Sequence, residues 1–262
     1  MFAVLKREFR SYFQNVIGWL FVAAPLGLFV LMALFGLYFY VYNLRQGYPY
    51  LYYTLSAITI IFMIAVPILT MRSFAEDRKN KTDQLMLTAP VPVAKVVLGK
   101  YLAMLAVFTV DIAVFCVTPL ILRAFGTIPM GESYIAILAF WLYGAASIAV
   151  GMFISALTES QVIAAVLTFV VLFISYMMQS LTGLISSDGN WLTKILNGLD
   201  LYAPFEKFQG GCLDITAILY YVTVIVLFNF FTVQAIQKRR WSISKKTFSL
   251  SVFSSSFIVV VF

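Results

Sequence analysis

The hydrophobic pattern divides the chain into long apolar runs that are separated by short polar stretches. A membrane-spanning helix needs about 20 mostly apolar residues, because at about 1.5 Å per residue that length crosses a hydrocarbon layer of about 30 Å. The runs that meet this requirement cover residues 16–42, 51–71, 96–122, 133–156, 161–183 and 214–236. The pattern therefore predicts an all-α membrane protein with six transmembrane helices.

Residues 2–16, which precede the first apolar run, have the periodicity of an amphipathic helix. At about 100° per residue, Phe9 and the other apolar side chains fall within an arc of about 100°, and Lys6, Arg7 and Arg10 fall on the neighbouring arc. Such a helix lies in the membrane interface with its basic side toward anionic headgroups. The pattern favours an in-plane helix, and the alternative is a basic flank that only orients the first span.

The composition supports a membrane protein and argues against an enzyme. Hydrophobic residues make up 62% of the chain and charged residues 11%, whereas soluble domains have about 45–50% and about 25%. The sequence has no His, and its two Cys, Cys116 and Cys212, form no metal-ligand spacing. It also has no glycine-rich phosphate-binding motif. We therefore expect no catalytic residue, metal or cofactor in this chain, and we expect any ATP to be bound by another chain.

Lysine and arginine set the expected orientation, because they concentrate on the cytoplasmic side of membrane proteins. Most of the 18 Lys and Arg residues lie before span one, between spans two and three, and after span six. The opposite faces hold Arg45, Arg123, Lys194 and Lys207. The sequence therefore predicts a multi-pass protein of the cell (inner) membrane with both termini in the cytoplasm. The net charge of +7 is then explained by lipid contact, and no nucleic-acid partner is expected.

A group of tyrosines flanks the predicted loop between spans one and two. Its members are Tyr38, Tyr40, Tyr42, Tyr48, Tyr50, Tyr52 and Tyr53. Tyrosine rings are amphipathic and suit the membrane–water interface. The favoured interpretation is an aromatic belt, and the alternative is an aromatic mouth that faces the substrate.

The most polar stretch, residues 72–95, is expected to be a loop with one short helix. Thr82 is a good N-cap, and Pro90 prevents the helix from continuing. The helix would expose the apolar residues 85–87 on the cytoplasmic side. Two interpretations remain open at this point: these side chains occupy a groove of a partner protein, or they fold back onto the membrane surface.

The connection between spans five and six, residues 184–213, is half apolar and interrupted by glycines and Pro204. Polar backbone groups cannot be exposed to lipid, so apolar non-helical segments at membrane depth must be covered by protein. We therefore expect short helices that dip into the outer leaflet under protein cover. A wholly solvent-exposed loop is the alternative.

Span four carries small residues at helical spacing. They are Gly144, Ser147, Gly151 and Ser155. Such a face lets helices approach closely, either within one chain or between two copies.

Asp111 is the one acidic residue well inside an apolar run. A charge at the centre of a membrane helix costs about 2.5–3.5 kcal/mol on insertion scales, so the side chain should face protein or water. The structural interpretation, a protonated or hydrogen-bonded carboxyl within the bundle, is favoured over a pathway carboxylate. The alternative function for the whole chain, an ion-coupled secondary transporter, would use Asp111.

Three stretches together resemble a known family. The first contains two acids and a base, Glu76-Asp77-Arg78, and ends at Pro90; the second is Gly99-Lys100 at the start of span three; the third, residues 151–165, covers the turn between spans four and five. Together they resemble the membrane subunit of an ABC transporter of the type-2 exporter family, closest to the gliding-motility-type and nitrous-oxide-cluster-type permeases. Lys81 departs from the pattern, because the family often has Gly there.

The resemblance implies a permease domain over residues 1–241, followed by a cytoplasmic tail over 242–262 whose structure is not assigned. The in-plane helix is similar to the elbow helix of the family, and residues 82–90 are similar to its coupling helix. The helices between spans five and six are similar to its outer re-entrant gate.

The same resemblance implies partners. A cytoplasmic ATPase dimer would bind ATP and Mg, and a second permease, identical or related, would complete the transporter in the lipid bilayer. This chain would be a transport subunit without enzymatic activity of its own. The residues implied at the ATPase interface are Glu76, Asp77, Arg78, Thr82, Gln84, Leu85, Met86, Leu87 and Pro90.

Overall fold

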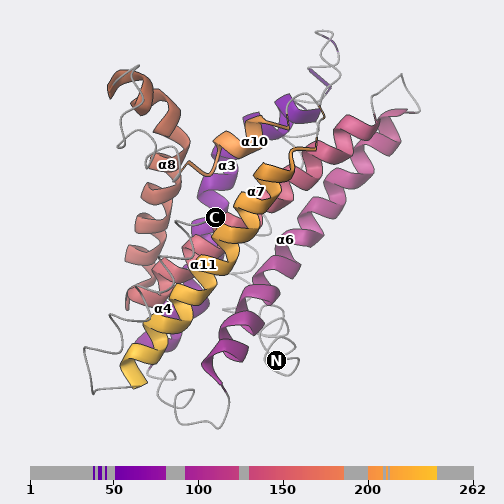
Figure 1. The fold of residues 1–262 in the computed structure, drawn as a ribbon. Helices are drawn as coiled ribbons and strands as arrows, with labels where there is room; N and C mark the ends of the chain where they lie inside the picture. Colours follow the sequence, from indigo (N-terminus) through magenta and orange to yellow (C-terminus); the bar gives the residue numbers. More distant parts are fainter. Residues whose placement is uncertain are drawn as a thin grey trace.

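The computed structural model is all-helical over the part of the chain that it describes, residues 38, 41–42, 45, 51–80, 92–123, 130–185, 200–208, 211 and 213–240. The helices with defined bounds are α3 (Leu51–Thr70), α4 (Arg72–Lys79), α6 (Val93–Arg123), α7 (Met130–Leu157), α8 (Gln161–Ile185), α10 (Ala203–Glu206) and α11 (Ile215–Arg240) (Figure 1). The predicted all-helical class is thereby confirmed.

Five helices of the described part are long and apolar enough to cross a membrane. They cover Leu51–Lys79, Val93–Val117, Met130–Leu157, Gln161–Met178 and Ile215–Lys238. These helices coincide with the predicted spans two to six. Most of the predicted first span, the in-plane helix, the short helix expected before Pro90 and the C-terminal tail lie outside the described residues.

The polar stretch after span two differs from the prediction, because residues 72–79 form α4 instead of a loop. Three residues of α4 are buried against the bundle, namely Ser73, Phe74 and Ala75. Hydropathy detects where side chains stop being apolar, but a helix continues as long as its backbone hydrogen bonds are made and one face can pack. The second span therefore extends past the apolar run.

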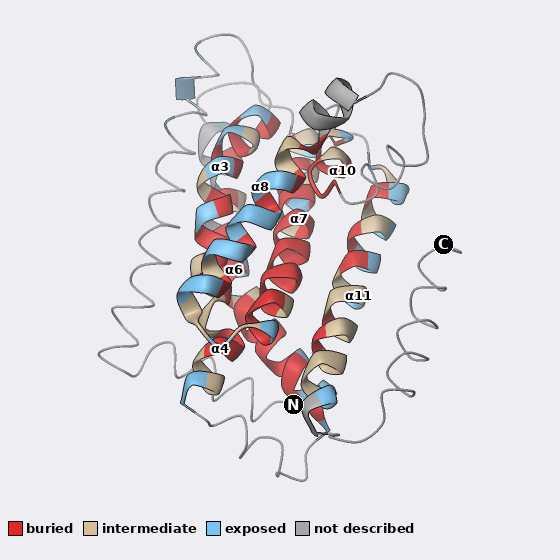
Figure 2. Cartoon of the chain, turned by 90° about the vertical axis from the view of Figure 1, so that its left-hand side faces the viewer, coloured by how far each residue is buried: buried red, intermediate tan, exposed pale blue. Residues whose placement is uncertain are grey.

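α7 is the central helix, and two pairs of helices pack on it. α3 and α8 pack on each other and on α7, whereas α6 and α11 pack on each other and on α7. We call these the α3–α8 pair and the α6–α11 pair. Figure 2 shows α7 buried along nearly its whole length, with exposed positions on the outward faces of the surrounding helices.

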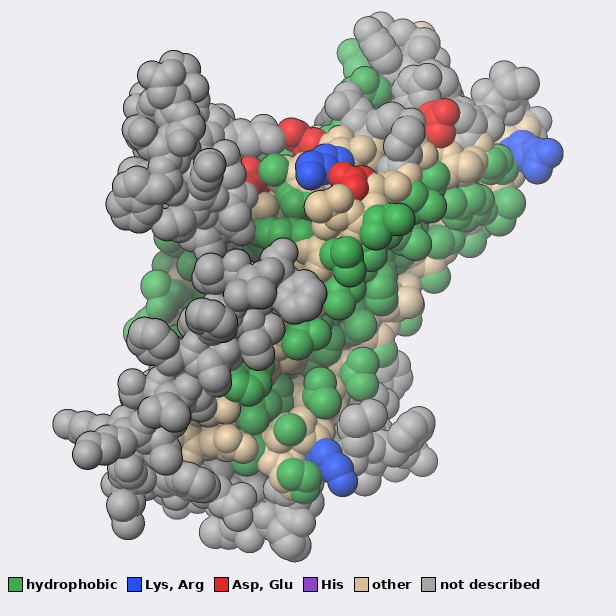
Figure 3. Space-filling view, viewed as in Figure 1, with side chains coloured by type: hydrophobic (Ala, Val, Ile, Leu, Met, Phe, Trp, Pro, Cys, Tyr) green, Lys and Arg blue, Asp and Glu red, His purple; other side chains and the backbone are tan. Residues whose placement is uncertain are grey.

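The bundle has two ends. The α4 end contains α4, the start of α6 and the last turns of α7 and α11, and the α10 end contains α10 and the start of α11 (Figure 1). Apolar side chains cover the flank between the two ends, and charged side chains lie at the ends (Figure 3). This distribution is what a bilayer requires of a protein surface.

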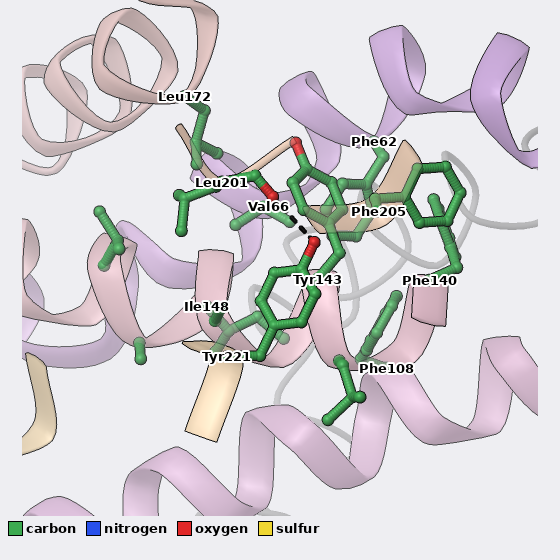
Figure 4. Packing of buried hydrophobic residues seen from close by; sticks show 14 of the residues in the cluster. Phe62, Val66, Phe108, Phe140, Tyr143, Ile148, Leu172, Leu201, Phe205 and Tyr221 are labelled. Atoms are coloured by element: carbon green, nitrogen blue, oxygen red, sulfur yellow. Dashed lines mark hydrogen bonds between the residues drawn. The ribbon is translucent and has the colours of Figure 1, made fainter. Parts of the chain in front are cut away.

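Aromatic rings fill the core on the α10 side of the bundle. The Phe62 ring of α3 lies 5.4 Å from the Phe108 ring of α6 and 5.2 Å from the Phe140 ring of α7. Phe205 of α10 packs against Phe140 at 6.1 Å, so α10 is part of the same core (Figure 4). Tyr52 corrects one expectation: it is 6% exposed and stacks on Phe205 at 5.0 Å, so it belongs to this core and not to an interfacial belt.

Candidate functional site

α4 follows α3 after a single turn residue, Met71, and carries the acid–acid–base motif of the sequence. Arg72 Nε donates to Glu76 Oε2 at 2.9 Å, an i,i+4 pair that supports the helix. Arg78 stands in the last turn, where the helix dipole favours a cation. α4 is therefore a regular helix that extends the second span beyond its apolar part.

Ser155, from the last turn of α7, caps the start of α4. Its Oγ accepts hydrogen bonds from the backbone N–H groups of Phe74 and Ala75, both at 3.2 Å, and donates to the Met71 carbonyl oxygen at 3.1 Å. The first N–H groups of a helix lack partners within the helix and need an outside acceptor. Here that acceptor comes from a different helix, so the start of α4 is fixed to α7.

Lys100, from the second turn of α6, also binds α4. Its Nζ donates to the Ser73 carbonyl oxygen and to Asp77 Oδ2, each at 2.6 Å, and lies 5.0 Å from the centre of the Phe74 ring. The Lys100 side chain is 5% exposed and that of Asp77 is 22% exposed. A buried ammonium is stable only when it is paired and hydrogen-bonded, and α4 provides those partners.

The small residues of α7 lie inside the chain. The structure buries all four of them, Gly144, Ser147, Gly151 and Ser155. A Cβ on Gly151 would lie 2.5 Å from Thr70 Oγ1 of α3 and 3.0 Å from the Thr168 methyl carbon of α8, and a Cβ on Gly144 would collide with the Phe108 ring. The missing side chains therefore allow α3, α6 and α8 to approach α7.

The structure brings the three sequence stretches that carry the family resemblance together at the α4 end. Glu76, Asp77 and Arg78 lie on α4, Lys100 on α6, and Ser155 on α7. We call this group the α4 junction. The remaining predicted interface residues, which are Thr82, Gln84, Leu85, Met86, Leu87 and Pro90, lie outside the described residues, as do Lys6, Arg7, Phe9 and Arg10 of the predicted elbow helix.

Asp111 lies on the buried side of α6 and is 9% exposed. Its Oδ2 has no hydrogen-bond partner among the described residues. The α4 junction does not include it, because Asp111 stands eleven positions, or about 16 Å along the helix, beyond Lys100.

At the α10 end, the segment 200–208 is held by hydroxyl groups from three spans. The N–H of Leu201 donates to Ser175 Oγ of α8 at 2.8 Å, and the Leu201 carbonyl accepts from the Tyr221 hydroxyl of α11 at 2.8 Å (Figure 4). The Tyr202 hydroxyl and Ser56 Oγ of α3 are 2.6 Å apart. Leu201 thus joins α8 to α11, one helix from each pair.

Asp200 fixes the start of α10. Its Oδ1 accepts hydrogen bonds from the N–H groups of Tyr202 at 2.8 Å and Ala203 at 3.0 Å. Burial raises the pKa of the Asp200 carboxyl above its ordinary value, although these two N–H groups act in the opposite direction. Phe205, in the middle of α10, is fully buried. Residues 200–206 of the connection between spans five and six are therefore largely covered by protein, whereas Lys207 and Leu213 are exposed.

From the sequence, Lys100 is a positive charge that sets orientation and a part of the Gly99-Lys100 motif, and Ser175 and Tyr221 have no assigned role. No local signal reveals these contacts, because a serine or tyrosine in an apolar run is compatible with many partners. Asp200 does have a signal: Asp side chains commonly accept hydrogen bonds from nearby backbone N–H groups where a turn or helix begins.

Comparison with known proteins agrees with this structure. Several apolar helices packed around one buried helix, with charges at the two ends, define a multi-pass membrane protein. The family model described as ABC-2 family transporter protein matches residues 39–209. The chain belongs to this family and is the membrane subunit of an ABC transporter. A comparison with curated proteins finds no match. The narrower resemblance, to gliding-motility-type and nitrous-oxide-cluster-type permeases, stays a prediction.

Proposed function

We propose that this chain is the permease of an ATP-driven exporter, and that it receives mechanical work at the α4 end from a separate ATPase subunit that binds ATP and Mg. The observation that carries the proposal is the α4 junction. A permease that binds no nucleotide needs a stiff element outside the membrane to accept force, and α4 is a helix anchored by both Ser155 and Lys100.

The α4 end faces the cytoplasm in this proposal. Basic residues support it, since Arg78 and Lys79 end α4, Lys95 lies in the first turn of α6 and Lys238 lies near the end of α11. Positive charge near span ends favours the cytoplasmic side. Both termini are then cytoplasmic, and the segment 200–208 closes the extracytoplasmic end as the outer gate.

The ATPase docks on α4 and on the stretch that follows it. Glu76, Asp77 and Arg78 place charged groups near the end of α4. Leu85 and Leu87 supply the apolar side chains that enter a groove in the ATPase. A second permease, identical or related, completes the pathway, and each permease binds one ATPase subunit.

Copurification tests the docking. The permease is coexpressed with its ATPase, extracted in mild detergent and captured through a tag on the permease. We expect Leu85→Asp or Leu87→Asp to abolish capture of the ATPase, because a carboxylate cannot enter an apolar groove. The matched control is Leu213→Asp, which places the same change on an exposed leucine at the α10 end. Retained capture in both Leu85→Asp and Leu87→Asp would contradict the proposal.

Cysteine labelling tests the orientation. In a background without Cys116 and Cys212, a single cysteine replaces either Lys79 at the α4 end or Leu213 at the α10 end. Both positions are exposed. We expect a membrane-impermeant maleimide added to intact cells to label position 213 and to label position 79 only after the cells are opened. The reverse pattern would place the α4 end outside and exclude a cytoplasmic ATPase at α4.

A further inference from the structure

We propose that Lys100 is a positioning residue that passes the movement of α4 to the α6–α11 pair. This inference rests on the proposed function, because it assumes that an ATPase moves α4. It adds a side-chain route by which that movement reaches α6, which follows α4 in the chain after residues 80–92.

The packing of the bundle creates the need for such a route. α4 is covalently continuous with α3, and α3 belongs to the α3–α8 pair. The α6–α11 pair packs mainly on itself and on α7. Displacement of α4 would therefore act directly on α3. It would reach α6 through residues 80–92 of the chain and through side-chain contacts between α4 and α6.

At the α4 end, Lys100 of α6 makes polar contacts with α4. Its Nζ binds Ser73 and Asp77, which are four residues apart on one face of α4, and it lies over the Phe74 ring between them. These three contacts fix the position of the ammonium along the axis of α4 and also hold it against the surface of the helix. The Lys100 ammonium is buried, so its bond to the Ser73 carbonyl is shielded from water, whereas Asp77 is 22% exposed.

Ser155, on α7, contacts the same part of α4. It binds Phe74, Ala75 and Met71 by three hydrogen bonds. α4 is therefore connected to α3 by the chain, to α7 by Ser155 and to α6 by Lys100. Removal of Lys100 breaks this side-chain connection between α4 and α6 and leaves the connections to α3 and α7 in place.

The test follows the distance between the two pairs by pulsed electron paramagnetic resonance. Nitroxide labels are placed at Val110 on α6 and Ile174 on α8, which are 58% and 46% exposed, in a background without Cys116 and Cys212. The permease is reconstituted in nanodiscs with its ATPase. Distances are measured without nucleotide and with ATP, Mg and vanadate, so no transport substrate is needed.

We expect nucleotide to change the label distance when Lys100 is present. Lys100→Met should remove most of that change while ATPase capture remains, because Leu85 and Leu87, the proposed apolar anchors, are unchanged. The matched control is Lys95→Met, the same substitution on the same helix at an exposed position, and it should keep the full change. If Lys100→Met does not fold, Lys100→Gln is measured in the same way and should also lose the change.

The outcomes separate the two proposals. A full distance change in Lys100→Met, or in Lys100→Gln where that variant replaces it, overturns the role of Lys100 and leaves the proposed function standing. If Lys95→Met also loses the distance change, the role of Lys100 is overturned too, because the loss would then not be specific to the buried contact of Lys100. Absence of both ATPase capture and any distance change in the unsubstituted protein refutes the proposed function, and the inference falls with it.

Discussion

Gly151 of α7 lies directly against Thr70 of α3, so close that a Cβ on the glycine would stand 2.5 Å from the threonine Oγ1. Thr70 is itself fully buried, and its hydroxyl is hydrogen-bonded to the Val66 carbonyl at 2.9 Å. Neither partner can move away without disturbing a helix. The contact lies one turn before Ser155, so it sets the separation of α3 and α7 just before the α4 junction.

We expect Gly151→Ala to destabilise the protein by about 1–3 kcal/mol, the usual penalty for overpacking a core. Thermal unfolding in detergent measures it as a lower Tm. The control is Gly131→Ala at the start of the same helix, where nothing lies within 4 Å of the added Cβ. A Gly131→Ala variant should be at least as stable as the parent. Equal Tm values for both variants would show that the Gly151 contact is loose.

Ser155→Ala should loosen the start of α4. The substitution removes the acceptor of two backbone N–H groups, and leaving buried donors unpaired costs about 1–3 kcal/mol. Hydrogen exchange at residues 72–75 should become faster. Ser147→Ala is the matched control, because the Ser147 hydroxyl donates to the Tyr143 carbonyl of its own helix and not to α4 among the described residues. Unchanged exchange in Ser155→Ala would mean that the cap does not hold α4.

Tyr221→Phe should release the segment 200–208 at the other end of the bundle. The variant keeps the ring and removes the hydroxyl that binds the Leu201 carbonyl, a loss of about 0.5–1.5 kcal/mol. Exchange of the amides of 201–208 is the measurement. Thr223→Val, which removes an exposed hydroxyl bonded to the Leu219 carbonyl of its own helix, should leave this exchange as it was.

Asp200 should make stability depend on pH. Burial raises the pKa of its carboxyl in the folded protein, so the folded state binds this proton more tightly than the unfolded chain does. The contribution of Asp200 to stability should therefore decrease as pH rises from the ordinary Asp value of about 3.9 through the raised folded pKa, and stay constant above it. Tm measured against pH for the parent and for Asp200→Asn tests this. The Asn variant keeps an oxygen that can accept the Tyr202 and Ala203 N–H groups and should lack this component of the slope; an identical slope in both would contradict the assignment.

Asp111→Asn should leave the complex folded and active in ATP hydrolysis. Asp111 is buried with one oxygen unpartnered among the described residues, so an amide of the same shape removes a potential buried charge and should not lower Tm. ATPase activity and Tm of the complex are the measurements. A large loss of ATP-dependent activity with unchanged Tm would favour the pathway role of Asp111 over the structural one.

The sequence predicts the positions of five spans well, because the apolar runs are long and the polar stretches between them are short. It misplaces the end of the second span, since hydropathy changes at residue 71 while the helix continues to Lys79. It also places Tyr52 at the interface. In a membrane helix both the lipid face and the core face are apolar, so periodicity does not tell them apart.

The candidate site is only partly predictable for a related reason. The acid–acid–base motif and Lys100 are visible in the sequence, but they lie 23 positions apart. Their pairing depends on the antiparallel packing of α3, α6 and α7, which propensity and pattern do not supply. Ser155 is recognisable as a small packing residue, and its role as a cap requires knowing that α4 begins beside it.

The bonds of Leu201 to Ser175 and Tyr221 use its main-chain N–H and carbonyl. They therefore do not depend on which side chain stands at position 201, with the exception of proline, which has no N–H to donate. The Leu201 side chain itself is buried in the core, so a substitution there changes side-chain packing at this end while the main-chain link between α8 and α11 is kept.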